Sequence, residues 1–492
     1  MATGFHLAIS HEISIITERT ALILQNRFVI SALFCTFAKE IESAMTLIIV
    51  FILLLCYFLI ATENITNINK AATAIFAGTV GWVLYICYGT NFVMSQHPDE
   101  YIDFLAGASP TSLAVKEYIA NNVFLTYVGR ASEVVTFLLA TMTIVEILNN
   151  NGCFDFITQL LKTRSSKKML WALTGVTFLL SANLDNLTTT VMMLTLMHQV
   201  ISSRRQRMVF GSAIVIAANM GGALTVIGDP SGLVIWNMGK VSATNFSMSL
   251  MIPCLISCII PVWWIGRSLP ERCDSEWITM PYRGNDTRLN VWQRLVMLFV
   301  GIGGLWFIPT FHNITQLSPF IGALCVLAVL WIVNEIFNRK LINSDQMTRS
   351  RVPGVLQYGV IQMMLFVMGM MLAIGVVQET GVTKWIIAEF GQHAKDVWLV
   401  GILSGAISSV LDNFATAMSF FSLSEAPLND LYWKMISYAT AVGGNILCVG
   451  SMSGMAFIKM ERIHIGWYFR HVGLATLVAS VFGLAILYFI NV

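Results

Sequence analysis

Long apolar stretches separated by short polar segments fill the chain from residue 45 onward. About 20 consecutive apolar residues are enough to cross a bilayer as a helix. The 492 residues have room for ten such spans, five on each side of a polar segment at 268–290. The pattern predicts an all-α polytopic membrane protein.

Two of the apolar stretches are interrupted in the middle by oxygen-bearing side chains. The first interruption is Ser181–Thr190, which contains Asp185, and the second is Ser408–Asn413, which contains Asp412. An aspartate at that depth costs about 2.5–3.5 kcal/mol on insertion scales. We therefore expect both interruptions to be compensated by a bound ion or by partners in the fold.

Basic residues flank the first interrupted stretch on both sides, namely Lys162, Arg164, Lys167 and Lys168 before it and Arg204, Arg205 and Arg207 after it. Basic loops stay on the cytoplasmic side. The stretch should therefore enter and leave on the same side, as a re-entrant hairpin over 169–201. The matching stretch, 397–424, has neutral to acidic flanks and is predicted to be a second hairpin that enters from outside.

Each hairpin is followed by a helix that the sequence cannot continue. Four glycines and a proline interrupt the predicted helix 208–240: Gly221, Gly222, Gly228, Gly232 and Pro230. Glycine and proline destabilise a helix interior. The related block Val442–Gly454 predicts a second broken helix at 432–458.

These blocks recur in the same order at nearly constant offsets, which predicts two repeats, 45–267 and 291–492, joined by a cytoplasmic loop at 268–290. Five spans per repeat is an odd number, so the repeats should be inverted. That topology puts twenty of the 29 Lys and Arg residues inside, six outside and three in the N-terminal segment. Residues 1–44 are too polar to span, and we expect a peripheral extension that lies upstream of the true start.

Composition agrees with a bilayer as the surrounding medium, since 56% of residues are hydrophobic and 11% are charged. A soluble domain is about a quarter charged. The basic residues are dispersed in short loops, so no nucleic-acid partner is expected. The nine cysteines form no CxxC and the eight histidines have no zinc-binding spacing. No cofactor is predicted.

The paired aspartates are the central site candidates. Asp185 and Asp412 each precede an asparagine (Asn186, Asn413) and follow a serine by four residues (Ser181, Ser408), and Thr189 lies close to the first. Na⁺ takes oxygen ligands of these kinds. A buried aspartate can exchange a proton for a metal ion, because burial disfavours its charge and an adjacent cation favours it. The alternative is that Asp and Asn only cap helices at the hairpin tips.

The first broken helix adds Asn219, Asp229 and Ser231, and the second supplies Ser451 in place of Asp229, together with Ser453. Asp229 precedes a proline, so it is either an ion ligand or a turn residue. Glu133 and Glu146 lie within one predicted span. They are candidates for a proton relay, or they pair with Arg130 or Lys162.

At these residues the sequence resembles the NhaD-type sodium/proton antiporters of the ion transporter superfamily. The resemblance covers about 45–490 and rests on five elements: 143–146, 181–189, 219–222 with 227–230, 408–413, and 443–445 with 450–451. It implies a scaffold domain and a transport domain, a homodimer in the bilayer and elevator-like movement. It also places seven residues at the ion and proton site: Asp185, Asn186, Asn219, Asp229, Ser408, Asp412 and Asn413. The Asn149–Asn151 run departs from the acidic residue and histidine expected in that family.

The sequence therefore predicts a secondary transporter of a bacterial inner membrane that exchanges cytoplasmic Na⁺ or Li⁺ for external H⁺. Inverted repeats with broken helices are typical of alternating-access transporters. One alternative is an anion carrier for a dicarboxylate or arsenite, which is disfavoured because no buried Arg or Lys is evident in the sequence to meet an anion. Another is an intramembrane aspartyl protease, which would not be expected to have duplicated aspartate motifs.

Overall fold

The computed structural model describes residues 44–106, 109–157, 163, 165–273, 289–338, 358–390 and 396–491. Within these residues the regular secondary structure is helical, and an isolated β-bridge joins Ser165 to Arg272. The predicted extension 1–44, except Ala44, most of the predicted loop 268–290, and Lys162 and Arg164 lie outside the described residues.

The first half of the chain folds into long helices joined by short helical segments. They are α2 (Ala44–Ala61), α3 (Glu63–Thr66), α4 (Lys70–Cys87), α5 (Gly89–Gln96), α6 (Pro98–Leu105), α7 (Ser112–Tyr118), the π-helical η1 (Ile119–Phe124), α8 (Leu125–Asn150), α10 (Ser166–Ser181), α11 (Asn186–Val200), α12 (Arg204–Leu224), α13 (Pro230–Asn237) and α14 (Ala243–Gly266). Asn69 caps α4 by accepting a hydrogen bond from the Ala71 amide.

The second half contains helices of similar lengths in a similar order. They are α15 (Val291–Thr315), α16 (Pro319–Asn338), α17 (Tyr358–Glu379), α18 (Val382–Phe390), α19 (Val397–Ser408), α20 (Asn413–Phe421), α21 (Leu431–Leu447), α22 (Met452–Glu461), α23 (Ile465–Tyr468), the π-helical η7 (Phe469–Gly473) and α24 (Leu474–Asn491).

Nine helical segments in the described part of the chain are long and apolar enough to cross a membrane. The first predicted span forms α2, whose apolar part, Met45–Ala61, is slightly shorter. Large apolar side chains on the outer helices, among them Phe51, Phe299 and Phe489, are more than 60% exposed, as expected for groups that face lipid. The prediction of an all-α polytopic membrane protein is confirmed.

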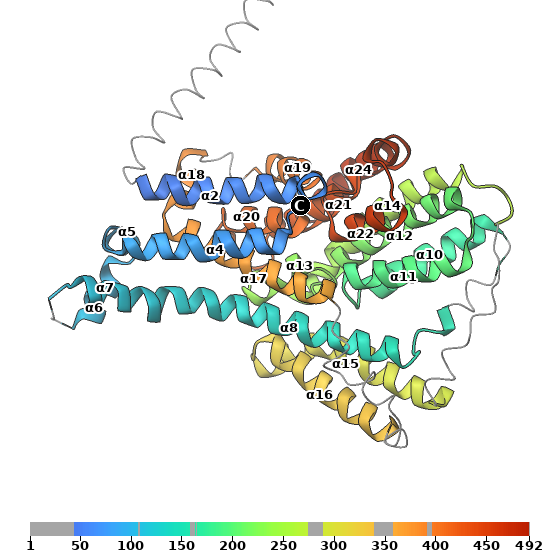
Figure 1. Cartoon of the computed structure of the whole chain (residues 1–492), viewed down its shortest axis with the longest axis horizontal. Coiled ribbons are helices and arrows are strands. Elements are labelled where there is room, and N and C mark those ends of the chain that lie inside the picture. Colours follow the sequence, from blue (N-terminus) through green and yellow to red (C-terminus); the bar gives the residue numbers. More distant parts are fainter. Residues whose placement is uncertain are drawn as a thin grey trace, which may run out of the picture.

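Burial separates central helices from peripheral ones. In the membrane-spanning part of α12, 83% of the residues are buried, whereas in that of α15 only 22% are buried. Helix α12 packs against α10, α11, α14, α21 and α22. Figure 1 shows α15 and α16 on the far side of α8 from α4, away from the cluster that contains α12. Helix α12 and its neighbours therefore form the interior of the protein.

Four helices stop in the interior and resume after a few residues, at α10–α11, α12–α13, α19–α20 and α21–α22. Glycine allows α12 to approach α10 closely, and α21 to approach α19. A Cβ at Gly221 on α12 would clash with the carbonyl of Phe178 on α10, and one at Gly443 on α21 would clash with the carbonyl of Gly405 on α19. Larger residues at these two positions would force the helices apart. The four breaks consequently lie deep among packed helices.

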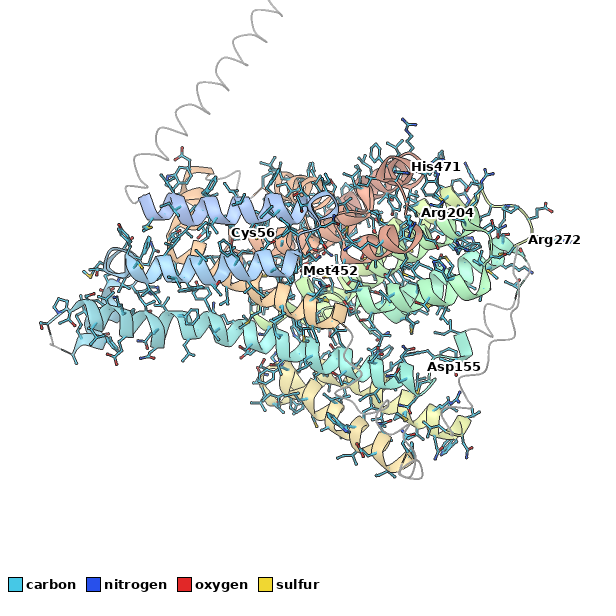
Figure 2. All side chains as sticks on the ribbon, viewed as in Figure 1. Cys56, Asp155, Arg204, Arg272, Met452 and His471 are labelled. Carbon is cyan, nitrogen blue, oxygen red and sulfur yellow. The ribbon has the colours of Figure 1, made fainter. Side chains whose placement is uncertain are left out.

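One end of the molecule carries several of the basic residues described. Arg204, Arg272 and His471 lie toward this end (Figure 2), where α12 begins. Arg204 donates hydrogen bonds to the carbonyls of Glu461 and Arg462, and Arg207 pairs with the Glu461 carboxylate at 3.0 Å. These contacts join the start of α12 to the end of α22.

Candidate functional site

Each of the four breaks ends in a polar side chain that caps the helix after it. Asp185 caps α11, Asp229 caps α13, Asp412 caps α20 and Ser451 caps α22. A carboxylate at a helix N-terminus accepts hydrogen bonds from free amides and meets the positive end of the helix dipole. The aspartates therefore do cap helices, as the alternative interpretation expected. The hydrogen bonds of the caps offset part of the free-energy cost of burying these carboxylates.

Asp185 is held mainly by Thr188, which hydrogen-bonds to one of its two carboxylate oxygens. Its Oδ2 accepts from the amide and the hydroxyl of Thr188, both at 2.8 Å. Its Oδ1 is buried and has no hydrogen-bond partner in the structure. The hydroxyl oxygen of Thr189, one residue further on, is in the same condition. Buried polar atoms without partners are rare, and each one suggests a ligand or water at the site.

Asp412 differs because a lysine reaches it. Its Oδ1 accepts from the Phe414 amide at 3.0 Å, and its Oδ2 lies 2.5 Å from Nζ of Lys70. Lys70 is the first residue of α4. The aspartate side chain is 4% exposed and the lysine side chain 16%. Asp412 thus has an ammonium counter-ion within the fold.

Asp229 connects the break between α12 and α13 to Asn413, the first residue of α20. Its Oδ1 accepts from the Ser231 amide at 3.2 Å, and its Oδ2 accepts from Nδ2 of Asn413 at 3.2 Å. It also lies close enough to Asp185 and Asp412 to interact with both through their charges. The sequence left Asp229 as ligand or turn residue, and here it caps a helix and also contacts the opposite hairpin.

A second contact between the halves is made by amide side chains. Nδ2 of Asn219 donates to Oδ1 of Asn445 at 2.7 Å and to Oγ of Ser451 at 2.9 Å. The remaining amide atoms, Oδ1 of Asn219 and Nδ2 of Asn445, are buried without a hydrogen-bond partner. Asn219 therefore offers a free oxygen next to a cross-link from α12 to α21 and to the N-cap of α22.

The predicted serines serve mainly to hold the breaks together. Ser181 Oγ donates to the carbonyl of Ala218 at 2.6 Å, and Ser408 Oγ donates to the carbonyl of Thr440 at 2.7 Å. Ser453 Oγ donates to the carbonyl of Asn186 at 3.1 Å, and the Ser231 side chain is 2% exposed. Hydroxyls that already donate to carbonyls can still accept, so they can still contribute oxygen atoms to an ion.

The two predicted relay glutamates both lie on α8. Oε2 of Glu133 accepts hydrogen bonds from Asn237 at 2.7 Å and from Ser318 at 3.1 Å. Those partners come from the end of α13 and the residue before α16, so Glu133 joins three elements, and neither partner is Arg130. Glu146 is buried, at 9% exposure, within the same helix.

Sequence reasoning missed two residues near the breaks, Lys70 and Asn445. Asn445 follows the paired glycines of the second broken helix, and that motif was the available signal. Lys70 gave no such signal in the sequence, because it ends a polar segment and resembles an ordinary residue that flanks a span. The expectation that no buried lysine is available was wrong, because Lys434 is 2% exposed and donates to Asn491. Lys70, which is only partly buried, reaches Asp412. A lysine stem crosses apolar surroundings easily, so its charge can lie far from its backbone.

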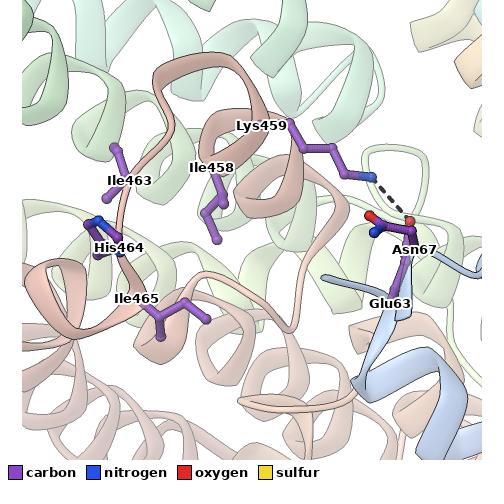
Figure 3. A pocket seen from close by; sticks show the side chains of 7 residues that line it. All are labelled: Glu63, Asn67, Ile458, Lys459, Ile463, His464 and Ile465. Atoms are coloured by element: carbon purple, nitrogen blue, oxygen red, sulfur yellow. Dashed lines mark hydrogen bonds and ion pairs between the residues drawn. The ribbon is translucent and has the colours of Figure 1, made fainter. Parts of the chain in front are cut away.

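A cavity of about 340 Å³ lies elsewhere, between α3 and the α22–α23 connection (Figure 3). Lys459 and Glu63 form an ion pair of 3.1 Å at its edge, and His464 contributes to its wall. None of the predicted site residues lines this cavity. Among the described residues, no three His, Cys, Asp or Glu side chains lie close enough together to hold a metal ion by themselves, and this includes the three aspartates at the breaks.

Comparison with known proteins matches this chain to membrane transporters. The sequence model of the family described as citrate transporter, CitMHS, matches residues 32–443. The chain belongs to this family. It is 32% identical to sodium/proton antiporter 2 of Arabidopsis thaliana over 70% of this chain and 82% of that protein, and 32% identical to sodium/proton antiporter 1 of the same plant over 70% and 59%.

A bacterial relative is similar over a comparable part of the chain. It is the Na⁺/H⁺ antiporter NhaD of Vibrio parahaemolyticus, 25% identical over 67% of this chain and 83% of that protein. The resemblance to NhaD-type transporters is therefore confirmed, and this member of the family is a multi-pass membrane protein.

Proposed function

We propose that this family member is a secondary transporter that exchanges cytoplasmic Na⁺ or Li⁺ for external H⁺. The observation that carries the proposal is the buried group of three carboxylates, Asp185, Asp229 and Asp412, at the ends of broken helices. Relatives named as sodium/proton antiporters support it. Family and relatives alike are named as transporters, which supports transport over proteolysis by an aspartate pair.

The carboxylates supply charge, and neighbouring groups supply the neutral oxygens that Na⁺ needs. Several buried oxygens in the described residues have no hydrogen-bond partner. Among them are Oδ1 of Asp185, Oγ1 of Thr189 and Oδ1 of Asn219, which come from the packed helices α11 and α12 and the cap of α11. When Na⁺ leaves, an uncompensated carboxylate takes up a proton, because a buried charge without a counter-ion is unstable. Glu133 and Glu146 on α8 then relay protons.

We further propose that the two halves are inverted repeats that work by alternating access. Matched contacts support this. The serine before each hairpin tip donates to a carbonyl of the following broken helix, at Ser181–Ala218 and at Ser408–Thr440. In such a protein the hairpins and broken helices form a transport domain that moves against a scaffold of the remaining helices. We expect a homodimer in the bilayer, and in bacteria the inner membrane as its site.

The decisive experiment is Na⁺-dependent dissipation of a pH gradient in everted membrane vesicles. Wild-type protein should collapse the gradient when NaCl is added and respond less or not at all to choline chloride. Asp185→Asn and Asp412→Asn should lose the response, while Asp155→Asn, a substitution outside the breaks, should keep it. Full activity of both site variants would refute the assignment.

An anion carrier remains the second candidate because of two observations, the family description as citrate transporter and the ammonium of Lys70 at a hairpin tip. Three carboxylates against one lysine, already paired with Asp412, disfavour an anion in this group. Adding citrate or another dicarboxylate to vesicles without Na⁺ separates the two. Uptake of labelled anion that Lys70→Met abolishes would favour the carrier.

A further inference from the structure

The ion pair between Lys70 and Asp412 sets one carboxylate of the proposed site apart from the other two. Asp229 has the neutral amide of Asn413 as its side-chain partner, and Asp185 has the hydroxyl of Thr188. Of these three aspartates, Asp412 is the one with a cationic partner among the described residues, and Nζ of Lys70 lies 2.5 Å from its Oδ2. A position that attracts an ammonium so closely also attracts a small metal cation, because both are stabilised by the same carboxylate.

The surroundings hold the ammonium in place without a second carboxylate. Nζ of Lys70 lies 4.7 Å from the centre of the Phe366 ring on α17, within the range of a cation–π interaction. The Phe366 ring also makes an edge contact with Phe414, whose amide donates to Asp412. Lysine, aspartate and the two rings therefore form one closed set of contacts between α4, α17 and α20.

This set of contacts joins two groups of helices. Helices α4 and α17 pack along each other and against α2. Helix α20 packs mainly against α21 and α19, and to a smaller extent against α13 and against α17 of the first group. Tyr57 of α2 adds a hydrogen bond to Ser419 of α20. The Lys70–Asp412 pair is thus a charged connection between the hairpin and the α2–α4–α17 group, in the position where a moving hairpin would have to separate from it.

We propose that Lys70 is a tethered counter-ion that occupies Asp412 when no Na⁺ is bound, and that an arriving Na⁺ displaces it. Displacement exchanges one cation for another on the same carboxylate and breaks the charged connection between hairpin and α4. Lys70 acts through Asp412 and is a positioning residue. This inference rests on the proposed function. It adds Lys70 to the site and a competition between its ammonium and Na⁺ for the Asp412 carboxylate.

The test compares Lys70→Met, Lys70→Arg and wild type by the KM for Na⁺ in everted vesicles. Removing the competitor should lower KM by about tenfold, which corresponds to about 1.4 kcal/mol. Lys70→Arg keeps the charge, so KM should stay close to the wild-type value. Lys434→Met is the matched control, because Lys434 is also buried but pairs with Asn491, and its KM should not change. An unchanged or raised KM in Lys70→Met would overturn the proposal.

A binding measurement covers variants that no longer transport. Purified wild type and variants in detergent are heated with increasing NaCl at constant ionic strength kept with choline chloride, since a ligand that binds the folded state raises Tm. Half-maximal stabilisation should require about tenfold less Na⁺ in Lys70→Met. In an Asp412→Asn background the substitution should make no further difference, and a persisting difference would contradict action through Asp412. If wild type neither exchanges nor binds Na⁺, the proposed function itself fails; if it does both and Lys70→Met is unchanged, only this inference fails.

Discussion

The tips of the two hairpins present the same side chains in different electrostatic settings. Each has a serine bonded to a carbonyl of the neighbouring broken helix and an aspartate capping the second arm. At the first tip, Asp185 keeps a buried oxygen without a hydrogen bond, and at the second, both oxygens of Asp412 are occupied, one of them by Lys70. A duplicated motif therefore does not imply two equivalent ion positions.

The difference suggests a division of labour. An oxygen atom with no partner is available to a cation at once, whereas an occupied one becomes available only after its partner leaves. In the proposed exchange, the first tip would therefore bind the ion first and the second would respond to it. The predictions below test this contrast from the largest expected effect to the smallest.

The strongest test replaces each tip aspartate by asparagine and compares stability. Asp412→Asn should lower the free energy of unfolding by about 2–3 kcal/mol, because it leaves Lys70 without its counter-ion. This is less than the roughly 3–5 kcal/mol expected for breaking a fully buried ion pair, because Lys70 is 16% exposed. Asp185→Asn should cost little, because it removes a charge that has no cationic partner. Thermal unfolding of the purified proteins without Na⁺ measures both. Equal losses would show that the tips are electrostatically alike.

Glycine substitutions test how tightly each tip is packed. A Cβ at Gly450 would overlap the Ser408 carbonyl more deeply than one at Gly228 would approach the Ser181 carbonyl, where the distance is 2.6 Å. Gly450→Ala should therefore cost about 2–3 kcal/mol and Gly228→Ala less. Gly175→Ala in α10 is the control, since nothing lies within 4 Å of its Cβ position and alanine favours a helix. A larger drop in Tm for Gly228→Ala than for Gly450→Ala would argue against tighter packing at the second tip.

Exchanging Asp229 and Ser451 tests the asymmetry of the broken helices. Asp229→Ser makes the first break resemble the second and removes the hydrogen bond to Asn413, so the KM for Na⁺ should rise about tenfold, or about 1.4 kcal/mol. The double variant Asp229→Ser/Ser451→Asp returns one carboxylate at the matched position, and we expect part of the affinity to return. Vesicle assays over a range of Na⁺ concentrations decide. A double variant as weak as the single one would mean that position matters more than charge.

The smallest expected effect concerns the amide pair across the halves. Asn219 donates to both Asn445 and Ser451, so Asn219→Ala removes two hydrogen bonds and Asn445→Ala removes one. The first should cost about 1 kcal/mol more in unfolding free energy than the second. Combining them in a double-mutant cycle isolates the shared bond. If the two losses are the same, the Ser451 contact contributes nothing measurable.

Much of the helical framework could be read from residue patterns. Apolar stretches of sufficient length predicted spans, and Gly221 and Gly228 with Pro230 predicted an interruption where α12 ends at Leu224 and α13 begins at Pro230. The predicted hairpin 169–201 covers α10 and α11. These features are local: hydrophobic length, helix-breaking residues and flanking charge act within a few turns, so they are visible in order along the chain.

The sequence by itself determined three things about this protein: its helical class, its family, and the positions of aspartates where its helices are interrupted. Tertiary structure decided their partners. Lys70 and Asp412 are 342 positions apart, and Asp229 and Asn413 are 184 apart. Side-chain contacts at such separations depend on how helices pack, which no local pattern specifies. For that reason the two tips look alike in sequence, and only the fold shows that Lys70 of α4 contacts one of them.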